Sequence, residues 1–455
     1  MRRDHQASHF VRVLGASAGP PRRAAAAGLG TLWTQCAGCP DFVARWAEPA
    51  CDALGAALED DDPGVRRAAV RGLERVGGER ALRALGGALD DPVAYVRQRA
   101  ILAVGRIGPD THRARLLAAL DEPRPLCLVA AEALGQSRHP TMETIEALQA
   151  WAVGSDLYVK RQATESMALL ARREQRLRAA VVTRLRQYLA ADTVADRGVA
   201  VRALGILRPQ GWVDDCVQAL DDPAPQVRIQ AVQVLLRRAG DRAVGLVERC
   251  VDDPCLAVRQ RMASILAQRR VYGVADVPGV LRLLDRLVDD EQPGVARDAV
   301  LAMGAIGAAA LPGSDGLAVL SRLRRWLAHR HAPVRAAAAR CLVPVGGPGD
   351  VDLLLPLFAD ADSLVRSASA QAAAGLDRRL RGSPRRVRSP LLEPLVVLLR
   401  DDDAGTRRSV AWALGDLGDR RAVPPLLQAA RRGGLSRWEV HGPLKRLSAD
   451  PGGLS

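Results

Sequence analysis

Cysteine and histidine are the residues of this chain that could supply metal or redox chemistry. Cys36 and Cys39 form its one C-x-x-C motif. A structural zinc site needs four ligands, and the nearest further candidates, Cys51, His5 and His9, stand at no recognised metal-binding spacing. The sequence therefore predicts no metal and no cofactor.

Motifs typical of catalysis are missing as well. The sequence has no Gly-rich phosphate loop after a strand pattern, no H-E-x-x-H and no nucleophile elbow. The seven histidines are scattered, and His329 and His331 flank Arg330 at a turn, where solvated side chains are expected. We therefore predict that the chain is not an enzyme.

Arginine is the residue type with the most binding chemistry to offer. Lysine and arginine number 65 against 51 acidic residues, which gives a net charge of +14, and Lys160 and Lys445 are the two lysines. Such a surplus of cations suits an acidic protein surface or the phosphates of nucleic acid. The densest arginine clusters span residues 172–186, 322–330, 378–388 and 420–446.

One of these clusters has the composition of a flexible loop. Residues 376–390 contain two Ser-Pro dipeptides, which favour turns and irregular backbone. A basic loop of this kind is a candidate partner-binding site. Its arginines are Arg378, Arg379, Arg381, Arg385, Arg386 and Arg388.

Many other arginines belong to a repeated pattern. Its first clear copy is residues 61–73, with the sequence DDPGVRRAAVRGL, and we call the residue at the place of Val65 the anchor. Successive anchors are separated by 30 residues (Val96 to Leu126) to 41 residues (Val365 to Thr406). The eleven anchors are Val65, Val96, Leu126, Val159, Asp196, Val227, Val258, Val295, Val334, Val365 and Thr406. A degenerate copy that starts at Pro21 is predicted to form a capping unit.

Each copy is predicted to form two helices separated by a tight turn. Apolar residues recur at helical spacing on both sides of the acidic-proline turn, for example from Val213 to Leu220 and from Val227 to Leu235. Neither helix can bury its apolar stripe alone, so the copies must stack on one another. The residue four places after the anchor is usually alanine, which favours close helix packing.

The copies resemble HEAT repeats, and within that group the bacterial lyase-type HEAT-like repeats. The resemblance rests on the Asp-Asp-Pro turns at Asp61, Asp90, Asp221 and Asp252, on Val-Arg pairs such as Val65-Arg66, and on Ala-Leu-Gly endings such as 133–135 and 413–415. It implies an all-α fold, an α-solenoid (right-handed superhelix) of about eleven two-helix repeats plus a partial N-terminal cap. It also implies that the second helices line the concave face and that the chain is a protein-binding scaffold.

The resemblance also implies that turn aspartates and the arginines after the anchors form a structural ladder. An aspartate just before a helix caps it and complements its dipole. Departures from the pattern occur at Cys127 and Ala296, which replace the arginine, and at Asp196, which replaces the apolar anchor. The ladder residues are Asp62, Arg66, Asp91, Arg97, Asp222, Arg228, Asp253 and Arg259.

The domain organisation follows from the repeats. We expect a disordered or irregular tail at 1–20, a partial capping repeat and loop at 21–40, the repeat solenoid at 41–430, and a basic cap or tail at 431–455. The sequence contains no apolar run long enough to span a membrane and no apolar core of a secretion signal after Arg2 and Arg3. Cytoplasmic localisation is therefore expected.

Binding is expected where the repeat is irregular. The longer spacings place extra residues at about 172–178, 271–277, 308–316 and 376–390, each after a second helix. Insertions along one edge of a solenoid often carry binding. The residues two and six positions after each anchor are expected to be exposed on the second helices. They form no continuous row of basic side chains, which binding along a phosphate backbone would require. In the last copy these places hold Arg408 and Trp412, which are candidate partner-binding residues, the tryptophan as an anchor for a partner.

Three classes of function remain open. We favour a non-catalytic scaffold for protein partners, which the positive charge predicts to be acidic. The alternative is a nucleic-acid-binding protein, either a plain RNA or DNA binder or one similar to HEAT-like DNA glycosylases, although no motif carries over the catalytic residues of those enzymes. The third is an enzyme or accessory factor that resembles the bilin lyases.

Overall fold

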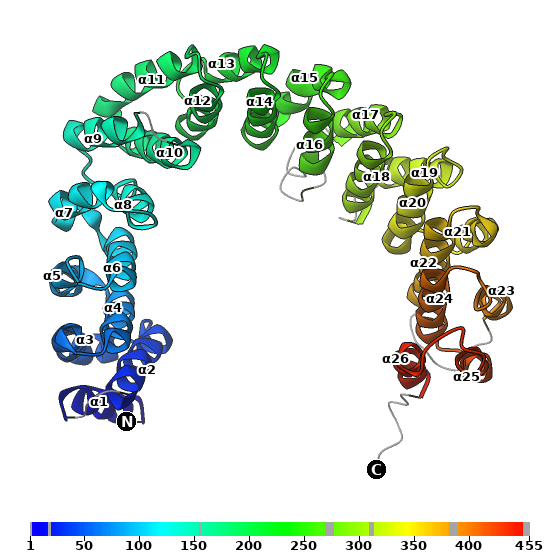
Figure 1. The fold of residues 1–455 in the computed structure, drawn as a ribbon, viewed down its shortest axis with the longest axis horizontal. Coiled ribbons are helices and arrows are strands. Elements are labelled where there is room, and N and C mark those ends of the chain that lie inside the picture. The colour runs from blue at the N-terminus through cyan, green and yellow to red at the C-terminus, as the bar shows by residue number, and fades with distance from the viewer. Residues whose placement is uncertain are drawn as a thin grey trace. The chain divides into compact units, whose positions relative to one another are not determined.

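The computed structural model describes residues 2–16, 20–153, 156–266, 268, 277–308, 314–381 and 389–448. These residues form an all-α fold of 26 α-helices, with short 3-10 turns and no strand among them (Figure 1). The helices alternate between two roles. We call the first helix of each pair the A helix and the second the B helix.

Thirteen A–B pairs follow one another in the described part of the chain. The A helices are α1 (Arg2–Ala16), α3 (Pro40–Ala56), α5 (Gly78–Ala88), α7 (Arg113–Ala118), α9 (Met142–Ala152), α11 (Gln175–Leu189), α13 (Trp212–Gln218), α15 (Ala243–Val247), α17 (Val277–Val288), α19 (Ser314–Trp326), α21 (Asp350–Leu354), α23 (Leu392–Leu398) and α25 (Val423–Arg431). The B helices are α2 (Pro20–Cys36), α4 (Pro63–Val76), α6 (Ala94–Ile107), α8 (Leu126–Leu134), α10 (Leu157–Arg173), α12 (Val194–Leu207), α14 (Pro225–Arg238), α16 (Leu256–Leu266), α18 (Pro293–Ala308), α20 (Ala332–Val345), α22 (Ser363–Arg381), α24 (Ala404–Leu417) and α26 (Arg437–Ser448).

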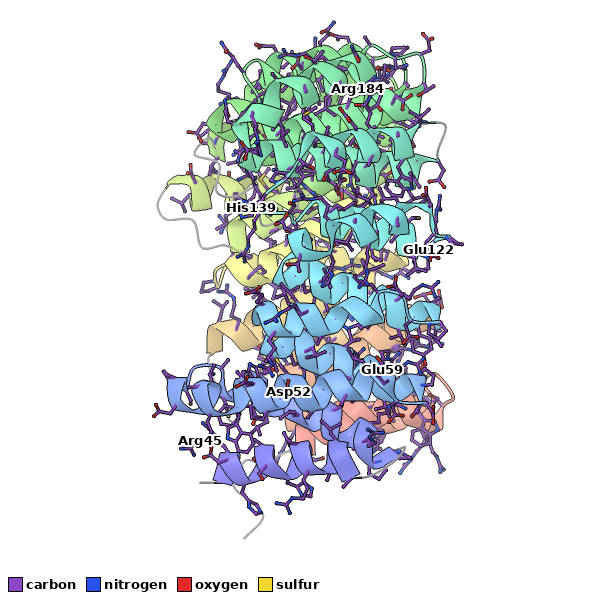
Figure 2. The ribbon with its side chains drawn as sticks, turned by 90° about the vertical axis from the view of Figure 1, so that its left-hand side faces the viewer. Arg45, Asp52, Glu59, Glu122, His139 and Arg184 are labelled. Carbon is purple, nitrogen blue, oxygen red and sulfur yellow. The ribbon has the colours of Figure 1, made fainter. Side chains whose placement is uncertain are left out.

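The chain divides into two compact units, Met1–Cys216 and Val217–Ser455. Within each unit the B helices stack on one another in chain order, as α4 packs on α6 and α20 on α22, and most A helices pack on their own B helix, as α3 does on α4 and α19 on α20. Each unit is therefore an α-solenoid of two helix layers. Figure 2 places Glu59 and Glu122, which lie in turns from an A to a B helix, on one edge of the first unit, and His139, in a turn from B to A, toward the other.

The turn from A to B is built by aspartate and proline. Asp62 Oδ1 accepts a hydrogen bond from the Gly64 N–H at 2.7 Å and caps α4, while Pro63 occupies the first helical position. Proline suits this position because its missing N–H has no partner in the first turn of a helix. The Asp-Asp-Pro pattern thus starts a B helix at a defined residue.

The repeated small and apolar positions form the core. Nine of the eleven anchors, from Val65 to Val365, are apolar residues with at most 7% exposure, and Thr406 is also fully buried. The residue four places after the anchor is buried in every copy, from Ala69 to Val410. Its small size in most copies lets the B helices pack closely.

The glycine that ends the Ala-Leu-Gly motif at 413–415, and its counterpart in Ala-Val-Gly at 103–105, lies where two B helices approach each other closely. A Cβ at Gly105 would lie 2.8 Å from the Ala133 Cβ and 3.0 Å from its Cα, and a Cβ at Gly415 would lie 2.9 Å from the Pro443 Cα. Real Cβ atoms do not approach a neighbouring helix backbone this closely. These glycines are therefore required by the stacking of α6 on α8 and of α24 on α26.

Two predictions about irregular segments are wrong. Residues 2–16 of the expected disordered or irregular tail form α1, because Ala7 and Leu14 lie at helical spacing and are buried. The insertion expected at 172–178 is not a loop, since only Glu174 separates α10 from α11 and the extra residues lengthen these two helices. Of the insertions expected at 271–277 and 308–316, residues 271–276 and 309–313 lie outside the described residues.

Candidate interaction site

The arginine that follows most anchors forms a ladder between neighbouring repeats. Arg66 Nε and Nη2 donate to the two carboxylate oxygens of Asp91 at 2.6 and 2.9 Å, and Arg66 Nη1 donates to the Asp60 carbonyl at 2.8 Å. Arg228 repeats this geometry with Asp253, at 2.7 and 2.8 Å. The planar fork of arginine matches the carboxylate, so each rung ties a B helix to the turn of the next repeat.

The same rung recurs along both units. Arg22 of the cap donates to Asp60 at 2.5 Å, and Arg97 donates to Glu122 at 3.2 Å. The further pairs are Arg259 with Asp290, Arg335 with Asp360 and Arg366 with Asp401. Asp62 and Asp222 each accept a backbone N–H at the start of their own helix, from Gly64 and Ala224.

Ladder aspartates have two hydrogen-bonding roles, and these lower their pKa values. Burial alone would raise the pKa of Asp253, but hydrogen bonds from Arg228 and from the Cys255 N–H outweigh it and leave the pKa below its ordinary value. For Asp401 the hydrogen bond from Arg366 is the main cause of the lowered pKa. These carboxylates are therefore held in the charged form.

The ladder changes character where the pattern departs from arginine and aspartate. Lys160 replaces the arginine and pairs with Asp196, the polar anchor of the next repeat, at 2.6 Å. Arg407 donates to the Gly434 carbonyl at 2.7 Å, where earlier rungs have a carboxylate. The polar anchor Asp196 thus has a partner inside the stack.

The arginines of the expected basic loop lie partly on a helix. Arg378, Arg379 and Arg381 belong to the last turns of α22, so the prediction of a loop is wrong for these residues. Arg378 pairs with Asp416 of α24 at 3.1 Å, and Arg379 donates to the Gly346 carbonyl. Arg385, Arg386 and Arg388 lie outside the described residues.

Trp412 and Arg408 lie together on α24 and both face α26. Arg446 of α26 stacks over the Trp412 ring, with its guanidinium carbon 4.9 Å from the ring centroid. Arg408 Nε donates to Glu439 at 2.7 Å. The indole is 37% exposed, so part of its surface remains open beside α26.

Other exposed aromatic residues were not selected from the sequence. Trp438 on α26 is 86% exposed. Tyr158 is 59% exposed and lies beneath the guanidinium groups of Arg124 and Arg161, at 5.7 and 5.6 Å. Tyr158 stands one residue before the anchor Val159. The repeat pattern places this position on the exposed side of the B helix, so the exposed tyrosine could have been predicted from the sequence.

The cysteines do not gather with other metal-binding residues. Among the described residues, no group of three or more His, Cys, Asp and Glu side chains is arranged to hold a metal ion. Cys36 is buried, and Cys39 accepts a contact from Arg3 at 3.6 Å. Burial raises the pKa of Cys216 and of Cys341 to about 12, so both thiols stay protonated at neutral pH.

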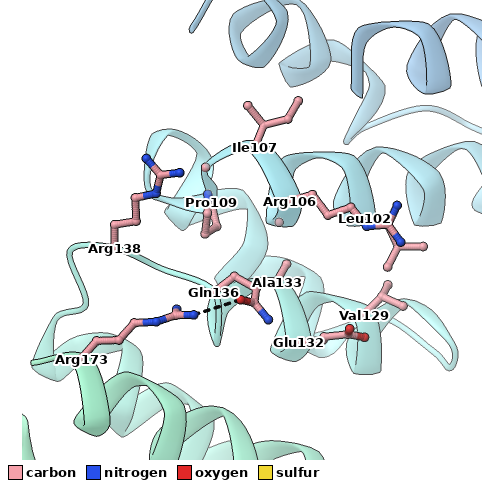
Figure 3. Close-up of a pocket in the computed structure, with 12 residues that line it drawn as sticks. Leu102, Arg106, Ile107, Pro109, Val129, Glu132, Ala133, Gln136, Arg138 and Arg173 are labelled. Carbon is pink, nitrogen blue, oxygen red and sulfur yellow. Dashed lines mark hydrogen bonds between the residues drawn. The ribbon is translucent and has the colours of Figure 1, made fainter. Parts of the chain in front are cut away.

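A hollow of the first unit lies between α6 and α8. It has a volume of about 540 Å³, and Figure 3 shows Arg106, Arg138 and Arg173 around it from three different elements. Arg173 is held by the Gly135 and Ser137 carbonyls, at 3.0 and 3.2 Å. The apolar lining comes from Leu102, Ile107, Pro109, Val129 and Ala133.

A stack of helix pairs with a buried arginine–aspartate ladder defines an α-helical repeat protein. A family model described as HEAT repeats matches residues 9–105, 51–127, 182–267, 280–374 and 380–437, which is more than half of the sequence. The chain belongs to the HEAT-repeat family. A search among curated proteins found no match.

Solved structures with the same fold include karyopherins. The Kap95 chain of a Kap95:Nup1 complex aligns with a TM-score of 0.52 and 13% identity over 97% of this chain and 67% of that chain. An importin beta structure aligns with a TM-score of 0.51 and 15% identity over 96% of this chain and 61% of that chain. At these identities the likeness concerns the fold, and this chain spans 67% and 61% of the length of these two chains.

None of the described helices is both long enough and apolar enough to cross a membrane.

Proposed function

We propose that this protein is a non-catalytic scaffold whose helical repeats bind other proteins. The observation that carries the proposal is the division of its arginines into two sets. Ladder arginines such as Arg66 and Arg228 are largely buried and bound inside the stack, whereas others, such as Arg71 and Arg138, are exposed and have no ion-pair partner in the described part of the chain. The fold uses the first set, which leaves the second for partners.

The repeat architecture supports the same function. A solenoid offers a long surface of side chains on rigid helices, and such surfaces bind extended partners. The Kap95:Nup1 complex is a solenoid of this fold together with another protein. We propose an acidic partner, because the exposed surplus of this chain is positive.

Affinity capture from the native organism tests the proposal. The full chain is expected to retain specific proteins, and a result in which it retains none above a bait-free control rejects the function. A variant with Arg378, Arg379, Arg381, Arg385, Arg386 and Arg388 changed to Ser tests whether the end of α22 and the residues after it contribute. Its matched control changes six arginines elsewhere to Ser, namely Arg12, Arg83, Arg172, Arg242, Arg282 and Arg340, which are exposed.

The control variant shows whether a lost interaction results from the lower net charge or from the position of the substituted arginines. We expect the first variant to lose one or more captured proteins that the control variant retains. Identical captures by wild type and both variants would reject a role for the α22 end and leave the scaffold function in place. Because Arg378 and Arg379 contact Asp416 and Gly346, urea unfolding of both variants must accompany the capture.

Nucleic acid is the alternative partner, and the clusters of exposed arginine favour it. Electrostatic binding to phosphates would weaken steeply as salt rises. Retention on heparin without affinity for duplex or single-stranded DNA or RNA at physiological salt rejects this alternative. Tight binding at that salt would favour it over the protein scaffold.

A further inference from the structure

The B-helix face of α4 and α6 carries a dense cluster of positive charge. Its arginines are Arg67, Arg71 and Arg75 on α4 and Arg99 and Arg106 on α6. Glu74 is the acidic residue among them, and it is bound on two sides, by Arg99 and by Arg106 Nη1 at 2.6 Å. One carboxylate among five guanidinium groups leaves a strong net positive charge.

The crowding of these cations has an electrostatic signature. Burial lowers the pKa of Arg99, and the charges of Arg71, Arg106 and Arg67 lower it further. Like charges this close destabilise one another. Bound anions would relieve the repulsion, so the cluster is suited to a ligand with several carboxylates.

The cluster continues into the hollow between α6 and α8. Arg106 belongs to both, and Arg138 and Arg173 lie on the other side of the hollow (Figure 3). Asp110 holds the backbone N–H of Arg138 at 2.9 Å, so the residue projects from a fixed loop. The guanidinium of Arg138 has no ion-pair partner within the described residues, and Leu102, Ile107 and Val129 supply an apolar surface beside it.

We propose that this surface, the α4–α8 groove, docks an extended acidic segment of a partner protein. The proposal rests on the scaffold function and assigns it a place and a partner chemistry. Carboxylates of the segment bind Arg71, Arg99 and Arg106 on one side of the hollow and Arg138 on the other, and one aliphatic side chain enters the hollow between them. The occupant is a peptide with acidic residues on both sides of a leucine or isoleucine.

A protein segment fits this groove better than a nucleic acid strand. The positive charge of α4 and α6 is interrupted along the B helices by Glu132 on α8, which itself lines the hollow, and by Glu165 on α10. A strand bound through its bases would need exposed aromatic rings for stacking. The described lining of the hollow contains none, and one face of the Tyr95 ring, which is 42% exposed, already contacts the guanidinium of Arg67 at 5.5 Å.

Fluorescence anisotropy on the full chain tests the proposal. The probe is a labelled peptide of alternating glutamate and glycine with one central leucine, and the comparison probes replace its leucine with asparagine or its glutamates with glutamine. A labelled single-stranded oligonucleotide of equal charge is the third comparison. The acidic leucine peptide is expected to bind most tightly at physiological salt, and both replacements are expected to weaken it.

The groove is tested with neutral substitutions. The variant Arg71→Gln, Arg106→Gln, Arg138→Gln is expected to bind the peptide about 30-fold more weakly, because each exposed ionic contact contributes about threefold. The control Arg12→Gln, Arg83→Gln, Arg242→Gln removes the same charge at exposed places outside the groove and is expected to bind as the wild type does. Equal loss in both variants would show a nonspecific charge effect and overturn the proposal.

Two further outcomes also overturn it. No peptide binding by the wild type rejects the groove, while specific proteins in the affinity capture would still uphold the scaffold function. Tighter binding of the oligonucleotide than of the peptide, lost in the groove variant, would assign the surface to nucleic acid. Unfolding of each variant in urea shows whether Arg106→Gln disturbs the pairing with Glu74.

Discussion

At the scale of single residues, the ladder arginines and the exposed arginines carry the same charge in different surroundings. The pair Arg228 and Asp253 leaves only 12% and 6% of its side chains exposed, whereas Arg249 and Asp221 leave 49% and 67%. When a buried carboxylate loses its cationic partner, water cannot reach it to solvate the remaining charge. An exposed one is solvated and screened.

Replacing Arg228 with alanine is therefore expected to lower the free energy of unfolding by about 3 kcal/mol, since it leaves Asp253 buried without its guanidinium. The measurement is urea unfolding followed by far-ultraviolet circular dichroism. Arg249→Ala, in the same part of the chain, is the matched control and is expected to cost about 0.5 kcal/mol or less. Equal effects of the two substitutions would mean that the ladder does not stabilise the stack.

At the scale of helices, glycine sets the spacing between neighbouring B helices. Gly105 faces Ala133 of α8 and leaves no room for a Cβ. At Gly198 on α12, a Cβ would have no atom within 4 Å. Helix propensity alone favours alanine over glycine by about 1 kcal/mol at both sites. At Gly105, packing against α8 opposes this preference for alanine.

We expect Gly105→Ala to destabilise the protein by about 1 to 3 kcal/mol, because the new methyl group pushes α6 away from the α8 backbone. Gly198→Ala is expected to stabilise it by up to about 1 kcal/mol. Thermal and urea unfolding of both variants measure whether each substitution raises or lowers the free energy of unfolding. Stabilisation by Gly105→Ala would show that α6 and α8 are free to separate.

At the scale of the whole molecule, the ladder makes stability depend on pH. Asp91, Asp253, Asp360 and Asp401 all have pKa values lowered in the folded state. A carboxyl whose pKa is lowered by folding adds stability above its unfolded value of about 3.9, and this stability is lost as the pH falls through the folded value. Several rungs titrate together.

The urea midpoint of the full chain is therefore expected to fall steeply below about pH 4, with the losses of the individual rungs adding along the stack. Urea titrations at successive pH values measure this. The variant Asp253→Asn is expected to be less stable at neutral pH and to show a shallower acid loss, because it has one ladder carboxylate fewer. An unchanged acid slope in that variant would exclude the ladder as the cause.

The period of the sequence is enough to predict the helical repeats, their register and most of their core. Anchors such as Val65 and the alanines four places later occupy equivalent surroundings in most copies, so their period reveals helix faces that must be buried. The HEAT-repeat family followed from the same period. Of the candidate site, the sequence supplied residue types: an arginine-rich end of α22, and Trp412 on an outward place of α24.

The tertiary structure decided which residues meet across repeats. Arg66 binds Asp91 rather than Asp62, Arg408 and Trp412 contact α26, and residues 2–16 form a helix that the repeat pattern does not contain. The hollow beside Arg106 is also formed by elements from three successive repeats. Such contacts depend on the spacing and offset of stacked helices, and these result from the packing of many side chains that have no common period.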